Sequence, residues 1–283
     1  KEIIMAVSLS NAFITLFDAE VKAAYQSTSM LKGCVRVRAG VNGSTYKFPK
    51  VGKGQAKERI PQTEVVPLNV TFSQVTATLK DYYAAEYSDI FSAGKVNFSE
   101  REELVKVLSM AIGRRHDQEI LDAASNSSTS LTVAASIGGA GTNLNVAKLR
   151  EAKKLLDAKN VPPGDRHIVI HANNLANLLS ETSVTSSDFN TVKALVSGDI
   201  SSFLGFNFYT IGDRDEGGLS LSGSDREVLA WHKDSIGLAE GMSPTTRIDY
   251  VADKTSFLVN SMFSAGGVAI DDEGIVKITC TES

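Results

Sequence analysis

Two of the four histidines, His167 and His171, lie four residues apart in the apolar run HIVIH. On a strand, both side chains would face the same side of a sheet, as two ligands of one metal ion must. A zinc site needs three or four ligands, and no nearby Cys, Asp or Glu completes the set. His116 and His232 have no evident carboxylate partner either. We therefore interpret the histidines as structural and expect no metal site.

Other catalytic motifs are incomplete. Ser29 and Lys32 match the S-x-x-K pattern of a nucleophile with its base, but the companion S-D-N and K-T-G motifs are missing. The glycine-rich residues 138–141 lack the Lys-Ser/Thr that follows in a phosphate-binding loop. The acidic residues of segment 213–216 (Asp213, Asp215 and Glu216) lack the pattern of a calcium loop, so we expect a solvated turn. The sequence predicts no active site and no cofactor.

The composition indicates a folded chain of one or two domains. Of the 283 residues, 42% are hydrophobic and 22% are charged, as is typical of globular proteins. No apolar run approaches the ~18 residues that span a bilayer, so no membrane contact is expected. Cys34 and Cys280 match no zinc or CxxC spacing. We expect two thiols in a reducing compartment, and a disulfide between them stays open.

Positive charge is concentrated near the N-terminus. The first 60 residues contain ten Lys and Arg against four Asp and Glu, a net charge of +6, and the remaining residues carry −10. A basic segment joined to an acidic body favours pairing between copies of the chain, or contact with nucleic acid. A solvated arm of no consequence would have the same composition.

A long helix is predicted from Ser99 to Ser125. Ser99 and Glu102 have the spacing of a capping box, in which both side chains satisfy backbone N–H groups of the first turn. At 1.5 Å per residue such a helix is roughly 39 Å long, so it must cross most of the molecule. Apolar residues recur at helical spacing, and they are Leu104, Val107, Leu108, Ala111, Ile112, Ile120 and Leu121.

The opposite face of this helix is charged, which predicts a helix that lies on the surface. Its charged residues are Arg101, Lys106, Arg114, Arg115, Asp117 and Glu119. Gly113 lies mid-helix and weakens the helix by ~1 kcal/mol relative to alanine. We interpret Gly113 either as a bending point or as a position that leaves room for a packed neighbour.

Extended runs precede the helix. After an expected helical arm at residues 8–29, the dipeptide Asn42-Gly43 between the extended runs 35–38 and 45–48 predicts a hairpin. The chain then alternates from residue 64 to residue 80, beyond a cationic, glycine-bearing tip.

The tip, residues 50–62, makes these runs a protruding two-stranded ribbon. Such a ribbon is at best marginally stable alone in water, and its edges are open. We therefore expect another subunit to support it. Three tyrosines in the segment 81–87 follow, and we expect them to pack under the long helix.

The rest of the chain mixes helices and strands, which predicts an α/β or α+β domain. A glycine-rich loop at 126–143 precedes a helix at 145–159 that Asn145 caps. The further expected elements are strands at 167–171, 206–211, 228–231, 246–250, 256–263 and 275–279, helices at 173–181 and 188–196, and glycine turns at 217–223 and 265–267.

The order of these elements resembles the major capsid proteins of tailed bacteriophages, whose Hong Kong 97-type fold is shared by encapsulins. Three local phrases carry the resemblance: GDISSFLGF at 198–206, VLAWHKDSIGLA at 228–239, and the strand pair at 263–278. The podovirus branch is the most similar. The resemblance covers nearly the whole chain and implies an α+β fold.

The resemblance also implies how the chain is divided. The expected parts are an N-terminal arm (1–43), an extended β-hairpin loop (44–80), a peripheral domain with the spine helix (81–142), an axial domain (143–240), and strands that return to the peripheral domain (241–283).

The implied function is structural and not enzymatic. Pentamers and hexamers of the chain would form an icosahedral shell, assembled in the host cytoplasm with scaffolding and portal proteins. The shell would enclose double-stranded DNA through non-specific contacts, and the protein would end in the virion. An encapsulin-like nanocompartment is the alternative, and a soluble enzyme of unrecognised type is the third.

Two site hypotheses accompany this function. We expect Lys50, Lys53, Lys57 and Arg59 in the ribbon to bind an acidic surface of the adjacent subunit. In this family the spine helix bends or straightens as the shell expands, which makes Gly113 a candidate hinge.

Overall fold

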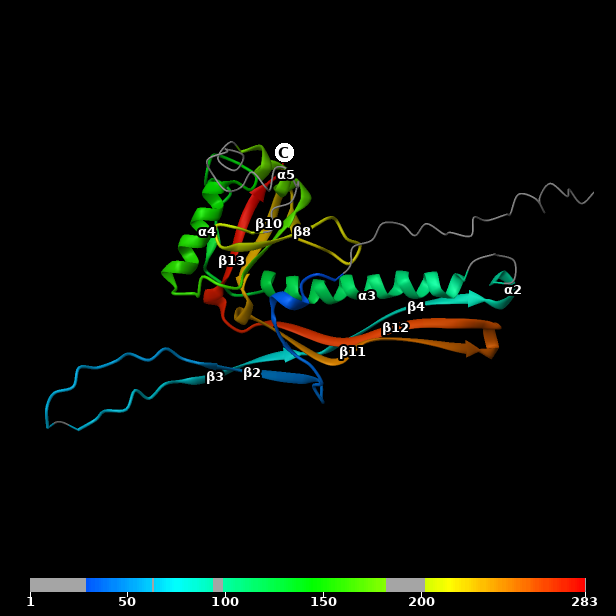
Figure 1. Cartoon of the computed structure of the whole chain (residues 1–283), viewed down its shortest axis with the longest axis horizontal. Helices are drawn as coiled ribbons and strands as arrows, with labels where there is room; N and C mark the ends of the chain where they lie inside the picture. Colours follow the sequence, from blue (N-terminus) through cyan, green and yellow to red (C-terminus); the bar gives the residue numbers. More distant parts are fainter. Residues whose placement is uncertain (1–28, 63, 94–98, 182–201, 283) are drawn as a thin grey trace, which may run out of the picture.

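The computed structural model describes residues 29–62, 64–93, 99–181 and 202–282. Its strands form an elongated four-stranded sheet, a compact seven-stranded sheet and a two-stranded ribbon (Figure 1). The helices expected at 8–29 and 188–196 lie outside the described residues.

The elongated sheet carries the longest helix. Its strand order is β1 (Arg36–Arg38), β11 (Ile236–Val251), β12 (Ser256–Ala269) and β4 (Lys80–Asp89). A short helix, α2 (Ile90–Ala93), follows β4, and helix α3 (Glu100–Ser125) then runs back along the sheet (Figure 1). The prediction of one long helix is confirmed.

The first turn of α3 differs from the prediction. The Ser99 hydroxyl makes no capping hydrogen bond, and the Ser99 carbonyl instead accepts from the N–H groups of Glu102 at 3.1 Å and Glu103 at 3.3 Å. The capping box is therefore not formed. Acidic side chains in this turn still stabilise the positive end of the helix dipole.

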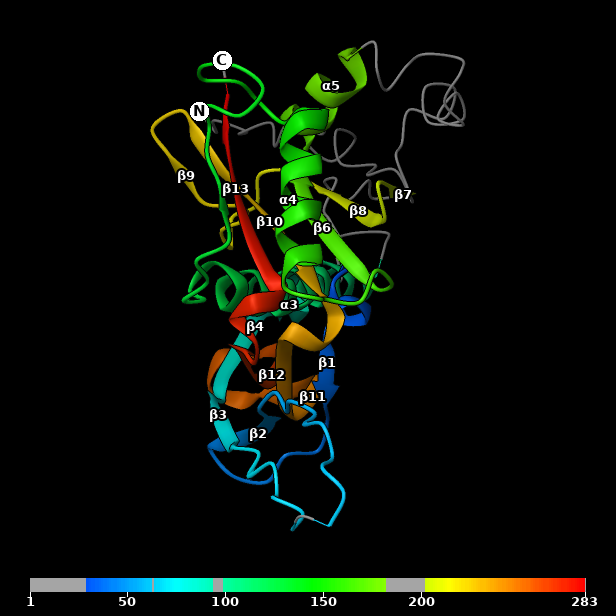
Figure 2. The ribbon, with the colours of Figure 1, turned by 90° about the vertical axis from the view of Figure 1, so that its left-hand side faces the viewer.

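The compact sheet forms the second body. Its order is β5 (Thr132–Val133), β13 (Ile275–Thr281), β10 (Asp225–His232), β6 (Arg166–His171), β8 (Phe206–Ile211) and β7 (Ser202–Phe203), with β9 (Leu221–Ser222) paired to β10. Helix α4 (Val146–Ala158) runs along one face of this sheet (Figure 2), and α5 (Ala172–Ser180) follows β6.

Local chemistry explains these elements. All six residues of β6 are buried, because the strand lies inside the sheet between β10 and β8. This position accounts for the apolar run at residues 168–170. Asn145 caps α4 as predicted, since its side chain accepts the N–H of Lys148 at 2.8 Å. Leu149 and Leu156 of α4 are fully buried in the main core.

The ribbon protrudes from the elongated sheet. β2 (Thr45–Val51) pairs antiparallel with β3 (Phe72–Thr78), and one further bond joins Gly52 N–H to the Thr71 carbonyl at 2.8 Å. Residues 53–62 and 64–70 continue outward without ladder pairing (Figure 1). Near the base, Phe48 is buried in a small second core.

The hairpin predicted at Asn42-Gly43 is wrong. β1 pairs in parallel with β11, from Arg36 opposite Gly237 to Arg38 opposite Ala239, and β2 pairs with β3. The turn therefore connects strands of two different sheets. Asn42-Gly43 does lie between two strands, but the first strand pairs with β11, about 200 residues away in the sequence.

The glycines expected in a turn at 265–267 lie inside β12. A Cβ on Gly266 would lie 2.0 Å from the carbonyl oxygen of Thr78, at the ribbon base, and one on Gly267 would lie 2.5 Å from the carbonyl oxygen of Glu119 in α3. Both residues are glycine because two backbones approach this strand closely.

The C-terminal segment, residues 236–281, contributes strands to both sheets. β11 and β12 belong to the elongated sheet, whereas β13 belongs to the compact one. A 3-10 turn, η4 (Asp272–Gly274), connects β12 to β13. The expected return segment 241–283 therefore does not stay in one body.

Candidate functional site

The described part of the chain carries no group of three or more His, Cys, Asp or Glu placed to hold a metal ion. None of its helices is long and apolar enough to cross a membrane. His171 acts structurally, since its Nδ1 accepts the N–H of Asn173 at 3.3 Å at the start of α5. Cys34 and Cys280 are buried free thiols, and burial raises the pKa of Cys280 to about 12.

The centre of α3 instead carries polar side chains that contact several distant segments of the chain. We call residues 114–119 the central segment; it begins directly after Gly113 and turns polar side chains to every side of the helix. Arg114 makes two hydrogen bonds to Glu216, each of 2.8 Å. Gln118 accepts the N–H of Gly218 at 2.7 Å. The loop expected to be a solvated acidic turn therefore holds the helix to the compact body.

Asp117 fastens the start of the described chain. Its carboxylate is fully buried and accepts from the Ser29 hydroxyl at 2.8 Å, the Met30 N–H at 3.0 Å and the Leu31 N–H at 3.1 Å. The guanidinium of Arg214 lies 3.3 Å away. Because every partner comes from outside α3, this residue joins three parts of the chain at one point.

His116 lies on another side of the helix and does have a carboxylate partner, contrary to expectation. Its Nε2 lies 2.8 Å from Glu240 Oε1, and both side chains are buried. Lys32 Nζ lies 2.7 Å from the same oxygen. Burial alone would raise the pKa of Glu240, but hydrogen bonds from Lys32 and His116 lower it below its ordinary value.

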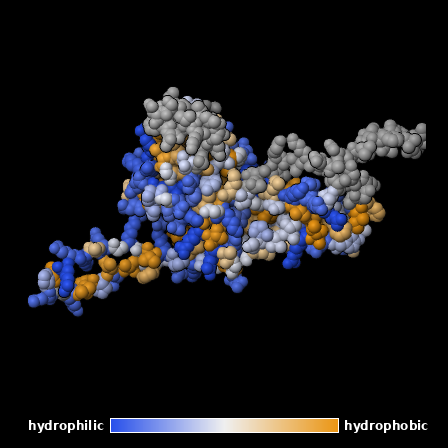
Figure 3. Space-filling view, in the orientation of Figure 1, coloured by the Kyte–Doolittle hydropathy of each residue, from blue (hydrophilic) through white to orange (hydrophobic). Residues whose placement is uncertain are grey.

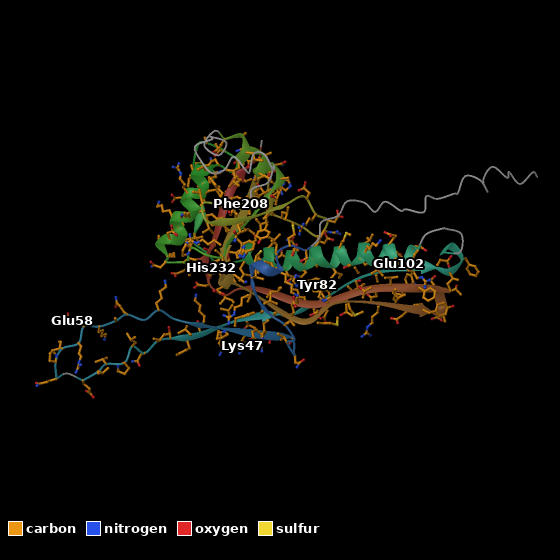
Figure 4. The ribbon with its side chains drawn as sticks, in the orientation of Figure 1. Lys47, Glu58, Tyr82, Glu102, Phe208 and His232 are labelled. Atoms are coloured by element: carbon orange, nitrogen blue, oxygen red, sulfur yellow. The ribbon has the colours of Figure 1, made fainter. Side chains whose placement is uncertain are left out.

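The underside of the central segment meets the elongated sheet. The Tyr82 hydroxyl donates to Glu119 and accepts from Arg115 at 2.9 Å, and its ring stacks on Phe263 with centroids 5.2 Å apart. Figure 4 shows Tyr82 beneath α3. The expected packing holds for this tyrosine, whereas Tyr83 is 78% exposed.

The prediction of a surface-lying helix is therefore wrong for the C-terminal half of α3. Asp117 and Glu119 were assigned to a solvated face, but both are buried, together with His116 and Gln118. Polar side chains can be buried when each finds a charged or hydrogen-bonding partner. Here the partners come from segments far away along the chain, which periodicity cannot reveal.

Gly113 sits where the chain at Ser29 crosses the helix. A Cβ on Gly113 would lie 3.3 Å from both the Cβ and the backbone nitrogen of Ser29. The helix continues through this residue without interruption. The glycine thus leaves room for a packed neighbour, which is one of the two interpretations of the sequence.

The four ribbon cations fall into two pairs. Lys50 lies 2.9 Å from Asp271, and Lys53 bonds Glu273 of the same chain. Lys159, the residue that follows α4, lies 3.2 Å from Glu273 as well, and Lys53 and Lys159 both lower the pKa of that carboxyl. Lys57 and Arg59, farther out, are exposed.

The outer ribbon is also apolar. Val65 is 84% exposed, and Figure 3 shows hydrophobic side chains along the ribbon and at the far end of the elongated sheet. The exposed apolar residues of the ribbon are Val51, Ile60, Val65, Val66, Leu68 and Phe72. Such a surface on a protruding element marks a protein interaction site.

A sequence model of the family described as phage capsid protein matches residues 9–282. The chain belongs to this family. It is a structural capsid protein that assembles with copies of itself into the shell of a virion. The predicted major capsid function is confirmed, and neither alternative gains support.

Solved structures show the same fold. The capsid of cyanophage P-SCSP1u is 15% identical, with a TM-score of 0.75 over 97% of this chain and 95% of that one. The head of Helicobacter pylori bacteriophage KHP40 is 13% identical, with a TM-score of 0.75 over 93% and 95%. The acidic stable capsid of phage KHP30 is 13% identical, with a TM-score of 0.73 over 99% of each chain. No curated protein sequence matches the chain.

We expect His167 to make the stability of this capsid protein depend on pH. The side chain is buried, and neither ring nitrogen has a hydrogen-bond partner. Burial lowers its pKa, so the folded state keeps His167 neutral while the unfolded chain takes up a proton below pH ~6.5. The free energy of unfolding contributed by this site is therefore constant above that pH and falls below it.

We expect H167L to remove part of this acid sensitivity. Urea unfolding of the unassembled protein at pH 7.5 and pH 5 measures the effect, and the difference between the two pH values should shrink in the variant. If the wild type and H167L lose the same free energy of unfolding between pH 7.5 and pH 5, His167 is not the source of the acid sensitivity.

Proposed function

We propose that this capsid protein forms an icosahedral shell of pentamers and hexamers that encloses double-stranded DNA by non-specific contacts. The observation that supports it most directly is the ribbon, whose residues 53–62 and 64–69 are exposed and lie beyond the last pair of the β2–β3 ladder. A two-stranded element of this kind needs a partner in water. We further propose that the shell is built in the host cytoplasm with scaffolding and portal proteins, and that it performs no catalysis.

The ribbon of one copy lies, in this proposal, over the body of the next. Its outer apolar side chains would be buried there, and Lys57 and Arg59 would meet carboxylates of the neighbour. Lys50 and Lys53 already have partners on their own chain, so they set the direction of the ribbon. Glu58, which Figure 4 places in the outer ribbon, reduces the positive charge that the outer pair provides.

Reversing the outer pair is expected to stop assembly. In K57E/R59E two attractive contacts per subunit become repulsive, and like charges brought together at an interface oppose association. Sedimentation of the purified protein should show free subunits, while circular dichroism shows an unchanged fold. The charge-preserving variant K57R/R59K is the matched control and should still assemble. Normal particles from K57E/R59E would end this part of the proposal.

Electron microscopy and nucleic-acid content test the shell itself. Closed particles containing nuclease-protected double-stranded DNA are expected after expression with the partner proteins. Particles that hold a protein cargo and no DNA would favour an encapsulin-like nanocompartment. A protein that stays monomeric at high concentration would contradict shell formation.

Gly113 is the proposed hinge of the spine helix. We expect G113A to assemble but to expand less readily. Alanine stabilises the helical conformation by ~1 kcal/mol relative to glycine, which makes bending at this position less favourable. Its Cβ would also press against Ser29. Particle diameter before and after the expansion step is the measurement. Expansion at the wild-type rate would leave Gly113 with the packing function alone.

A further inference from the structure

The outer edge of β11 is open along most of its length. β1 covers only Gly237, Leu238 and Ala239, and one further bond joins the Val41 N–H to the Glu240 carbonyl at 2.9 Å. Beyond Glu240, no strand of the described chain pairs with this edge. Figure 1 shows β11 as the lower rim of the elongated sheet.

Only the last part of this edge is regular. The pairing of β11 with β12 shifts register between Glu240 and Met242 and again between Met242 and Thr245, and Pro244 lies within the second shift. From Thr246 to Val251 the register is unbroken. Proline and bulges protect an open edge, so the unprotected edge consists of residues 246–251, which we call the open edge.

The sequence of the open edge is complementary to itself when two copies run antiparallel. We infer that it pairs antiparallel with the open edge of a second copy across a two-fold axis, centred on Ile248. This register sets Ile248 opposite Ile248, Arg247 opposite Asp249 and Thr246 opposite Tyr250. Directly opposite residues share a face. Both opposite-charge pairs therefore lie on one face, and the Ile248 pair with the two Thr246–Tyr250 pairs lies on the other.

The exposure of these side chains supports a second copy as the occupant. Ile248 is 47% exposed and Tyr250 is 51% exposed, so the pairing would remove apolar surface from water as well as satisfy the edge N–H and C=O groups. The ribbon of another copy fits less well. Pro67 interrupts its extended run, because proline cannot donate to a ladder.

This pairing rests on the proposed shell, which supplies the second copy at high local concentration. In the shell it would join two elongated sheets into one continuous eight-stranded sheet, since each copy contributes four strands. A subunit contact of this kind is separate from the one assigned to the ribbon.

Cysteine cross-linking tests the register. In assembled particles, I248C should give covalent dimers with a short bis-maleimide reagent, because opposite Cβ atoms lie about 5 Å apart. Cys34 and Cys280 are buried and keep the background low. Y83C lies on the other edge strand, β4, where the native side chain is more exposed than Ile248, and it should stay monomeric. Intact particles without I248C dimers would overturn the inference and leave the shell standing.

Further variants test whether the ribbon occupies the open edge instead, and whether the charge pairs contribute to assembly. If particles of I248C/V65C link the edge to a ribbon in place of a second edge, the ribbon occupies this surface and the inference is wrong. R247D sets carboxylates opposite each other at both charge pairs and should reduce particle yield roughly tenfold. The double variant R247D/D249R restores opposite charges and should restore the yield. Equal yields from the single and double variants would also overturn the pairing.

Discussion

Replacement of Asp117 by alanine is expected to lower the free energy of unfolding by about 3–5 kcal/mol, the usual loss when one partner of a buried charge pair is removed. The carboxylate is fully buried and accepts from Ser29, Met30 and Leu31. Without it, two backbone N–H groups and the charge of Arg214 lose their buried acceptor. Each unsatisfied donor costs about 1–3 kcal/mol.

Urea unfolding of unassembled D117A measures this loss, and D122A is the matched control on the same helix. Asp122 is 42% exposed, so its removal should cost about 1 kcal/mol or less. We also expect D117A to release residues 29–31 from α3, which increased proteolysis there would report. If both variants unfold at the same urea concentration as the wild type, Asp117 is not the anchor described above.

Gly266 to alanine is expected to have the second large effect. The new Cβ would lie 2.0 Å from the carbonyl oxygen and 2.7 Å from the carbonyl carbon of Thr78. These are backbone atoms, so neither can rotate away, and the ribbon base must separate from β12. Overpacking of this kind costs about 1–3 kcal/mol, and more where the backbone must move.

The functional consequence exceeds the loss of stability. Thr78 is the last residue of β3, so a displaced ribbon base swings the whole ribbon away from its target. Particle yield should therefore fall even at temperatures where G266A remains folded. G164A is the control, because a Cβ at Gly164 meets no atom within 4 Å. Full assembly of G266A would show that the ribbon tolerates a change of direction.

Local signals made much of the fold predictable. The bounds of α3 and α4 follow from apolar periodicity and from the Asn145 cap, and β6 follows from its buried run. The ribbon followed from two extended segments around a cationic tip. Each of these depends on neighbours within a few residues, which a sequence displays directly.

The central segment of α3 could not be predicted in the same way. His116 and Asp117 have partners in β11 and at residues 29–31, and nothing near them in the sequence marks those contacts. The Asn42-Gly43 turn and Gly266-Gly267 failed for a related reason. A glycine signal gives the permitted backbone conformation or close approach, but only the tertiary structure decides which one is used.

Glu273 has a mechanical consequence for the shell. It lies in η4, the turn through which the chain passes from the elongated sheet to the compact one. It pairs with Lys53 of the ribbon and with Lys159, the residue that follows α4. Rotation of one body against the other therefore pulls on the ribbon through Glu273 and through the nearby Asp271, which pairs with Lys50. Water screens exposed ion pairs such as these, so thermal motion breaks and remakes them. These ion pairs therefore favour one orientation of the ribbon on the subunit and still allow that orientation to change when the two bodies rotate.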